Sequence, residues 1–159
     1  MKTIYLVRHA HAQPGMADFE RHLSDRGKKE ATQIAQKLLK RNVRIDAWFC
    51  SSSKRTTETA ELISSEMQNI ISNFHKLDAL YLASSQQLQE QIIQMGNDLA
   101  SIAFVVHNPG VTELASKICS EVFIDEMPPC AVFAVQSDAA NWIDFFKNKI
   151  EFLFFVCPG

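Results

Sequence analysis

Short apolar runs alternate with segments of helical periodicity along the 159 residues of this chain. The apolar runs are rich in β-branched and aromatic residues, which is typical of buried strands. They predict strands at residues 3–7, 45–50, 73–77, 102–106, 131–136 and 150–156. The segments between them predict helices at residues 24–40, 54–67, 85–95 and 109–119, and a short helical connection at 138–147. Such alternation predicts a mostly parallel sheet with helices on both faces, and therefore a three-layer α/β/α sandwich.

Length and composition predict a single domain over residues 1–159. Hydrophobic residues make up 47% of the chain and charged residues 21%, which is enough for a full core. The sequence contains no repeat, low-complexity segment or linker that would divide it. A formal net charge of -2 argues against nucleic acid or an acidic membrane as the main partner.

No apolar run is long enough for a membrane-spanning helix, and Arg8 and His9 interrupt the first run before a signal-peptide core forms. We therefore expect a cytoplasmic protein. The cysteines are widely spaced, lack a C-x-x-C pair and lie among apolar neighbours, at Cys50, Cys119, Cys130 and Cys157. This pattern is typical of reduced core thiols rather than of a zinc site or a disulfide framework.

The strongest indication of a functional site is the pair Arg8-His9, directly after the first predicted strand. Strands of open α/β sheets end at the edge where such folds bind their ligands. His107 follows another predicted strand in the same way, and Arg55 lies one helical turn beyond Ser51, where a third strand ends. If these three strands are neighbours, both histidines and both arginines meet in one crevice.

Two cations, two imidazoles and the N-termini of two helices around one point suit phosphoryl transfer. Helix N-termini favour anions, and a transferring phosphoryl group spreads negative charge over its oxygens. A neutral imidazole can attack phosphorus without a separate base. A metal site on His9 and His11 is the alternative. Because no second cluster of histidines and carboxylates supports it, we expect neither a metal nor another cofactor.

Four motifs, in this order, resemble the histidine phosphatase superfamily. They are Leu6-Val7-Arg8-His9-Ala10, Leu23-Ser24-x-x-Gly27, Ser51-x-x-x-Arg55-Thr56-x-Glu58-Thr59 and His107-Asn108-Pro109-Gly110. The short length, Leu80-Tyr81-x-Ala83 and Met127-Pro128-Pro129-x-Ala131 also resemble its SixA-type branch, the phosphohistidine phosphatases. The resemblance covers nearly the whole chain and implies a phosphoglycerate mutase-like fold without a capping subdomain.

The resemblance also implies a role for each matching residue. His9 would be the nucleophile that forms a phosphohistidine intermediate. The phosphoryl oxygens would be bound by Arg8, Arg55 and His107, with His107 at least partly protonated. Arg21 matches an extra arginine of the SixA-type branch and would also face the phosphate.

Two positions depart from the superfamily pattern. Ala10 stands where the superfamily usually has glycine, so it would add strain if this turn needs a positive φ. Asp78 is the carboxylate nearest to where larger members carry an acid, but it matches no family acid and stays unassigned. The segment between Met67 and Gln86 is too short for a capping subdomain. An open site of this kind would admit a phosphohistidine on another protein, whose nitrogen leaves readily without a positioned acid.

These features favour a metal-independent phosphatase that hydrolyses phosphohistidine on a signalling or phosphotransfer protein. The alternative is a small-molecule phosphomonoesterase or phosphoanhydride hydrolase with the same histidine nucleophile. A mutase is less favoured because it must keep its phosphoenzyme in a closed pocket. A non-catalytic phosphate-binding module is disfavoured because both histidines are present. The expected partner is thus a phosphate group, on a histidine phosphotransfer protein or on a small molecule, and the sequence leaves the oligomeric state open.

Overall fold

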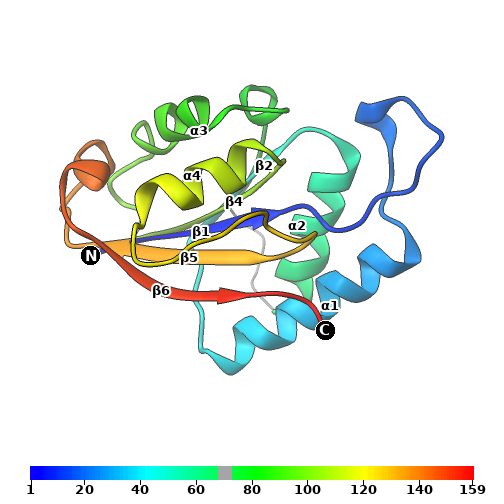
Figure 1. The fold of residues 1–159 in the computed structure, drawn as a ribbon, viewed down its shortest axis with the longest axis horizontal. Coiled ribbons are helices and arrows are strands. Elements are labelled where there is room, and N and C mark those ends of the chain that lie inside the picture. The colour runs from blue at the N-terminus through cyan, green and yellow to red at the C-terminus, as the bar shows by residue number, and fades with distance from the viewer. Residues whose placement is uncertain (68–72) are drawn as a thin grey trace.

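A computed structural model describes residues 1–67 and 73–159 of the protein (Figure 1). The strands of these residues form one sheet in the order β3-β2-β4-β1-β5-β6. They are β1 (Lys2–Arg8), β2 (Ala47–Ser51), β3 (Phe74–Leu77), β4 (Ser101–Val106), β5 (Val132–Ser137) and β6 (Ile150–Val156). Neighbours from β3 to β1 pair in parallel, whereas β5 is antiparallel to both β1 and β6. The predicted mostly parallel sheet is therefore confirmed.

Helices cover both faces of this sheet. They are α1 (Asp25–Lys40), α2 (Lys54–Glu66), α3 (Ser85–Ile92) and α4 (Gly110–Ile118), with 3-10 turns η1 (Asp18–Glu20), η2 (Asp78–Leu80) and η3 (Trp142–Lys147). α1 and α2 pack on one face, and α3 and α4 on the other (Figure 1). This is the predicted three-layer α/β/α sandwich. Within residues 1–67 and 73–159, none of the helices has the length and apolar character that crossing a bilayer requires.

The central strand β1 divides its side chains between two cores. Ile4 and Leu6 belong to the core beneath α3 and α4, whereas Tyr5 and Val7 belong to the core beneath α1 and α2. All four are buried. Burial on both faces explains why this strand is apolar at consecutive positions, without the alternation of a half-exposed strand.

Side-chain caps set the starts of two helices. Ser24 accepts a hydrogen bond from the Gly27 N–H (3.1 Å) at the start of α1, which confirms the predicted cap. Ser84 and Gln87 form a reciprocal capping box at the start of α3. α3 is shorter than the predicted helix through residue 95. It ends because the Met95 N–H bonds to the Ile92 carbonyl, three residues back, which tightens the chain into a turn.

The strand order places the ends of β2, β4 and β1 next to one another, as the sequence required. Arg8 is paired with Val106 in the parallel register, so His9 and His107 follow as the next residues of adjacent strands. The His9 N–H donates to the Val106 carbonyl at 3.0 Å, which continues the ladder to the histidine. α2 and α4 begin at this same edge, just after Ser53 and Pro109.

Candidate active site

The hydrogen bonds of His9 define its protonation. Its Nδ1 lies 2.8 Å from the carbonyl oxygen of Ala10. A carbonyl only accepts, so Nδ1 carries the proton and Nε2 keeps a free lone pair. The Nε–H of Arg55 donates to this Nε2 at 3.3 Å. The unprotonated nitrogen of His9 therefore faces a guanidinium, which is the arrangement that a nucleophile for an anionic phosphoryl group requires.

His107 is the second imidazole of the site, and it is buried. Arg55 Nη2 donates to its Nδ1 at 3.2 Å, so the ring proton lies on Nε2, which donates to Ser51 Oγ at 2.8 Å. The rings of His9 and His107 are 5.4 Å apart, with an angle of 61° between their planes. Arg55 thus bridges both histidines, and Ser51 at the end of β2 holds the far side of His107.

Asp18 holds the outer side of the Arg55 guanidinium. Its carbonyl accepts from Nη1 at 2.6 Å, and its Oδ2 accepts from Nη2 at 3.0 Å. The Tyr81 hydroxyl donates to the same Oδ2, and Arg21 Nη1 lies 3.3 Å from Oδ1. The Tyr81 hydrogen bond and then Arg55 lower the pKa of Asp18, so this carboxylate is ionised and compensates part of the positive charge.

Arg8 approaches the site from β1. Its Nη1 donates to the Met127 carbonyl at 2.7 Å and lies 3.6 Å from Glu126 Oε1. Its Nε is buried and has no hydrogen-bond partner among the described residues. A buried donor of this kind is costly unless an acceptor reaches it. An oxygen of a bound phosphoryl group would provide that acceptor.

Backbone contacts fix the turn that carries His9. The Ala10 N–H donates to Thr59 Oγ1 at 3.0 Å, and the Thr59 hydroxyl donates to the Arg55 carbonyl at 2.7 Å. On the other side, the Cys130 N–H donates to the His9 carbonyl at 3.1 Å. These contacts explain why Thr59 lies four residues after Arg55. They also explain why Cys130, after Pro129, belongs to the site.

Two motif glycines allow close backbone contacts around the site. A Cβ on Gly27 would overlap the His11 carbonyl oxygen, and a Cβ on Gly110 would overlap the carbonyl oxygen of Ala83. Ala10 needs no such freedom. Positive φ angles of non-glycine residues occur elsewhere in residues 1–67 and 73–159, at Asn42, Leu82 and Cys130. Alanine in place of the usual glycine therefore adds no left-handed strain to this turn.

Burial and the arginines keep both histidines neutral. Burial lowers the pKa of His9 to about 4, with further lowering by Arg55, Arg8 and Arg21 against the Ala10 hydrogen bond. Burial lowers the pKa of His107 to about 3, and His9 and Arg55 act in the same direction. The expected partial protonation of His107 would therefore need the negative charge of a phosphoryl group beside it, and it stays a prediction. The main physical reason for the low pKa of His107 is burial, with smaller contributions from His9 and Arg55, and the charge of Asp18 opposes them.

The structure brings four of the predicted residues together: Arg8, His9, Arg55 and His107. Arg21 lies further out, where its Nε donates to the Gln13 carbonyl at 2.8 Å and its Nη1 contacts Asp18. It still lowers the pKa of His9 through its charge. Arg21 therefore reaches this site through Asp18 and its electric field.

Two other residues considered from the sequence are engaged elsewhere. Asp78 accepts a hydrogen bond from the Ser52 hydroxyl and is exposed. His11 Nδ1 lies 2.7 Å from Ser24 Oγ, at the start of α1. No group of three or more histidine, cysteine or carboxylate side chains suited to a metal is present in the part of the chain that the structure describes. Of the segment between Met67 and Gln86, residues 68–72 lie outside the described residues.

Sequence reasoning missed Asp18, the residue with the most contacts to the arginines. Asp18 lies in the loop after β1, in the 3-10 turn η1. No predicted strand ends there and no helical periodicity covers it, so the sequence pattern gave no reason to place it in the site. The one available signal was its spacing of three from Arg21, which matches an ion pair in a helical turn. Tyr81 was noted as part of a motif, but its contact with Asp18 depends on the packing of two separate turns.

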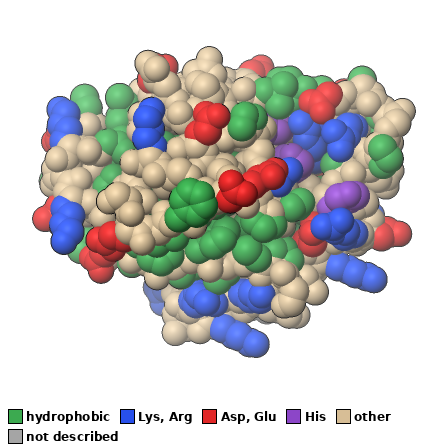
Figure 2. All heavy atoms as spheres, viewed as in Figure 1, with side chains coloured by type: hydrophobic (Ala, Val, Ile, Leu, Met, Phe, Trp, Pro, Cys, Tyr) green, Lys and Arg blue, Asp and Glu red, His purple; other side chains and the backbone are tan. Residues whose placement is uncertain are grey.

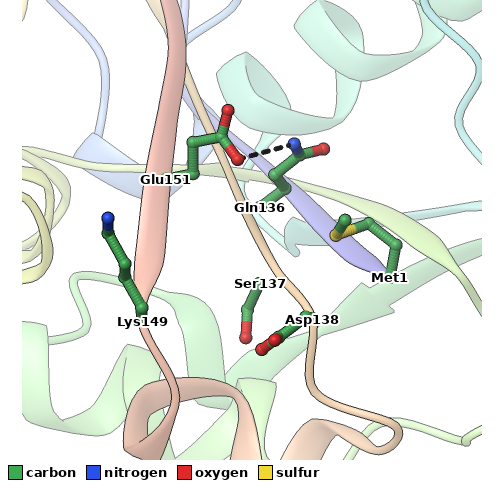
Figure 3. A pocket seen from close by; sticks show the side chains of 6 residues that line it. All are labelled: Met1, Gln136, Ser137, Asp138, Lys149 and Glu151. Carbon is green, nitrogen blue, oxygen red and sulfur yellow. Dashed lines mark hydrogen bonds between the residues drawn. The ribbon is translucent and has the colours of Figure 1, made fainter.

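Figure 2 shows histidine, lysine and arginine side chains gathered at one end of the molecule, on the right of the view, where β1 ends. A cavity of about 290 Å³ lies instead at the opposite edge of the sheet (Figure 3). It is lined by Met1, Gln136, Ser137, Asp138, Lys149 and Glu151. Ser137 pairs with Lys2 at the start of β1, and the Gln136 amide donates to Glu151 at 3.2 Å (Figure 3). This lining, with its carboxylates and no imidazole, does not suit phosphoryl chemistry.

Comparisons with known proteins agree with this geometry. The structure is similar to that of SixA, a proposed phosphohistidine phosphatase of Agrobacterium tumefaciens, with a TM-score of 0.81, 23% identity and coverage of 99% of both chains. It is similar to the protein histidine phosphatase SixA in complex with tungstate, with a TM-score of 0.82 and 21% identity over 98% of this chain and 97% of that one. A phosphoglycerate mutase of Bacillus anthracis gives a TM-score of 0.68 and 14% identity over 84% and 87% of the two chains.

At these identities the structural likeness concerns the fold, which is the expected phosphoglycerate mutase-like one. The family itself follows from the sequence. Residues 4–107, more than half of the chain, match the model of the histidine phosphatase superfamily, branch 1. The match begins within β1 and ends at His107, so it contains both histidines and both arginines of the site. The chain therefore belongs to the histidine phosphatase superfamily.

Proposed function

We propose that this protein hydrolyses phosphohistidine on a signalling or phosphotransfer protein, with His9 as the nucleophile. The observation that carries the proposal is the state of His9. Its proton is held on Nδ1 by the Ala10 carbonyl, and its Nε2 lone pair faces Arg55. A neutral, oriented imidazole beside two guanidinium groups can attack a phosphoryl group without a separate base.

The reaction proceeds in two transfers. In the first, His9 Nε2 forms a bond to phosphorus while the bond from phosphorus to the substrate imidazole breaks. The electron pair of that bond stays on the leaving nitrogen, and a proton on the other nitrogen of the substrate ring lets it leave as neutral imidazole. In the second, water attacks phosphorus, the P–Nε2 bond breaks, and the water proton is released as inorganic phosphate departs. Both transfers need stabilisation of the phosphoryl oxygens more than a strong base.

Arg55, Arg8 and His107 would supply that stabilisation. Arg55 Nε and Nη2, which donate to the imidazole nitrogens of His9 and His107 in the structure, would turn to phosphoryl oxygens. Arg8 Nε would add the donor that has no partner among the described residues. The negative charge of the phosphoryl group would raise the pKa of His107 and favour its charged, donating form.

A protein substrate with a nitrogen leaving group fits the surroundings of the site. In the described part of the segment between α2 and α3, residues 73–84 form a four-residue strand and one 3-10 turn, and His9 remains half-buried. Asp78, its first carboxylate, is bound to Ser52. Without a positioned acid, alkyl phosphates would react slowly, which disfavours a small-molecule phosphomonoesterase.

The test compares wild-type protein with His9→Ala and with His75→Gln, a change at an exposed histidine of β3 that lies outside the site. His9→Ala should abolish turnover of a phosphohistidine-bearing phosphotransfer protein, whereas His75→Gln should retain it. Rapid quenching of the wild type should trap acid-labile, base-stable phosphate on His9. Turnover by folded His9→Ala, or an acid-stable label, would overturn the nucleophile.

Metal independence belongs to the same proposal. Positive charge in the site comes from arginine side chains, so EDTA should leave the rate nearly unchanged. A large loss that zinc or manganese restores would instead support a metal on His9 and His11.

A further inference from the structure

A row of rings leads from the nucleophile to the protein surface. The His9 ring is 5.4 Å from that of His107, and the Tyr81 ring is 5.5 Å from that of His107. Phe19 follows, with its ring 5.1 Å from that of Tyr81 and nearly perpendicular to it, at 79°. We call Phe19 and Tyr81 the aromatic lip. It extends the active site beyond the groups that contact the phosphoryl oxygens.

Core packing does not account for the aromatic lip. Neither Phe19 nor Tyr81 belongs to the two core clusters of the described residues, and Phe19 is 37% exposed. A single exposed phenylalanine is ordinary on a protein surface, so its exposure alone carries no argument. Its position does, because Phe19 contacts Tyr81, which itself contacts His107, so both rings lie beside the active site.

The Tyr81 ring is held in place from two directions. Its hydroxyl donates to Asp18 Oδ2, the atom that also accepts from Arg55, so the ring keeps a fixed position relative to the guanidinium. The following residue, Leu82, has a φ of 51° and is 56% exposed. A left-handed backbone is costly for a bulky side chain and is typical of functional sites. This turn directs the chain back after Tyr81.

We propose that the aromatic lip binds the planar ring of the leaving group, so that the site prefers phosphoryl groups carried on a flat ring. This inference rests on the proposed function and names the feature of the substrate that the site recognises. The ring is either the imidazole of phosphohistidine on a protein or the ring of an aryl phosphate. Its nearest atom lies one bond from phosphorus in phosphohistidine and two bonds in an aryl phosphate, so the ring is within reach of a side chain that contacts His107.

The expected preference follows from ordinary aromatic contacts. A pair of aromatic rings in edge-to-face or offset contact adds on the order of a 2- to 12-fold preference beyond the burial of area. Replacing one ring of the lip by an aliphatic side chain should therefore lower kcat/KM for ring-bearing substrates by about tenfold. Substrates without a ring should be affected much less.

The experiment uses the full chain and the changes Phe19→Leu, Tyr81→Leu and Tyr81→Phe. The substrates are phosphoimidazole and p-nitrophenyl phosphate, which carry a ring, and phosphoramidate, which has the same P–N bond as phosphoimidazole without a ring. Phe19→Leu compared with the wild type, and Tyr81→Leu compared with Tyr81→Phe, should each lose about tenfold in kcat/KM for the two ring-bearing substrates and less than about threefold for phosphoramidate. The activity towards phosphoramidate also shows that each variant is folded.

Tyr81→Phe is the matched control, because it removes the hydroxyl that contacts Asp18 but keeps the ring. It should change the rates of all three substrates by the same factor and leave the preference for a ring intact. Equal losses for ring-bearing and ring-free substrates in the leucine variants would overturn the inference. So would an unchanged rate with phosphoimidazole.

A phosphotransfer protein that carries phosphohistidine is assayed in parallel. It distinguishes the two sources of the ring, and it separates a failure of the inference from a failure of the proposed function. If the wild type leaves that protein intact but the leucine variants lose aryl phosphate activity selectively, the proposed function fails and the aromatic lip stands. If the wild type dephosphorylates that protein and the leucine variants keep the wild-type ratios, the lip fails and the proposed function stands.

Discussion

Thr59 connects the turn that carries His9, the proposed nucleophile, to Arg55, and its replacement by valine tests how this turn is positioned. Its hydroxyl accepts from the Ala10 N–H at 3.0 Å and donates to the Arg55 carbonyl at 2.7 Å. Thr59 and Ala10 are both fully buried. Valine has nearly the same shape, so the change removes the hydroxyl and leaves the Ala10 amide without its acceptor.

The size of the effect follows from these contacts. A buried amide that loses its acceptor costs about 1–3 kcal/mol, which for a domain of this length corresponds to about 2–4 °C in Tm per kcal/mol. The turn that carries His9 should also shift, and a displacement of about 1 Å at a reacting group can cost about 100-fold in rate. We expect Thr59→Val to lower kcat by about 10- to 100-fold.

Thr59→Ser is the matched control. It keeps the hydroxyl and removes one buried methyl group, which costs about 0.8 kcal/mol. Its kcat should remain within about threefold of the wild type, because the Ala10 amide keeps its acceptor. Thermal unfolding and steady-state hydrolysis of p-nitrophenyl phosphate measure both quantities. If Thr59→Val is as active as Thr59→Ser, the hydroxyl does not position the nucleophile and the reasoning fails.

Three further perturbations test other parts of the site. In an NMR titration of the free protein, His9 should titrate at about pH 4 and His107 at about pH 3, well below the ordinary 6.5. The unfolded chain binds these protons at a higher pH than the folded chain does. The free energy of unfolding should therefore fall as the pH drops below 6.5 towards these values. Titration of both rings near 6.5 would contradict the burial argument. Gly110→Ala should lower the free energy of unfolding by about 1–3 kcal/mol, since the new Cβ overlaps the Ala83 carbonyl, and an unchanged denaturation midpoint would contradict that close packing. Asp78→Asn should change turnover of phosphohistidine by less than about threefold, whereas a loss of about 100-fold, the scale of a general acid, would favour phosphate esters as substrates.

The sequence predicted the part of the site that depends on strand ends. Apolar runs that stop at Arg8-His9 and before His107 placed both histidines at the carboxyl edge of a parallel sheet. The structure confirms this, because Arg8 and Val106 are in register on neighbouring strands. The alternation of strands with helices is a local property, and the binding edge of a parallel sheet follows from its topology. Both can therefore be inferred from a single sequence.

The residues around this centre could not be predicted in the same way. Asp18 and Arg21 lie in a loop whose path depends on contacts with α2 and with Tyr81. The conformation of Cys130, with a φ of 62°, depends on the carbonyl of His9 that its amide binds. Loops follow no hydrophobic period, so their side chains can be placed only when the elements that they touch are known.

The protonation of His107 shows how a role inferred from resemblance depends on the state of the site. In the structure, burial lowers the pKa of His107, and His9 and the nearby Arg55, which donates to its Nδ1, act in the same direction, so the ring is neutral. Burial, and then the charges of Arg55, Arg8 and Arg21, likewise lower the pKa of His9 and keep its ring neutral. A bound phosphoryl group would reverse the balance at His107, because its negative charge would compensate Arg55 and occupy its donors. In the proposed mechanism, the cationic cluster would thus keep His9 neutral before binding and stabilise the phosphoryl charge after it. Asp18, held by Tyr81 and Arg55, is the carboxylate that makes so much buried positive charge tolerable until the substrate arrives.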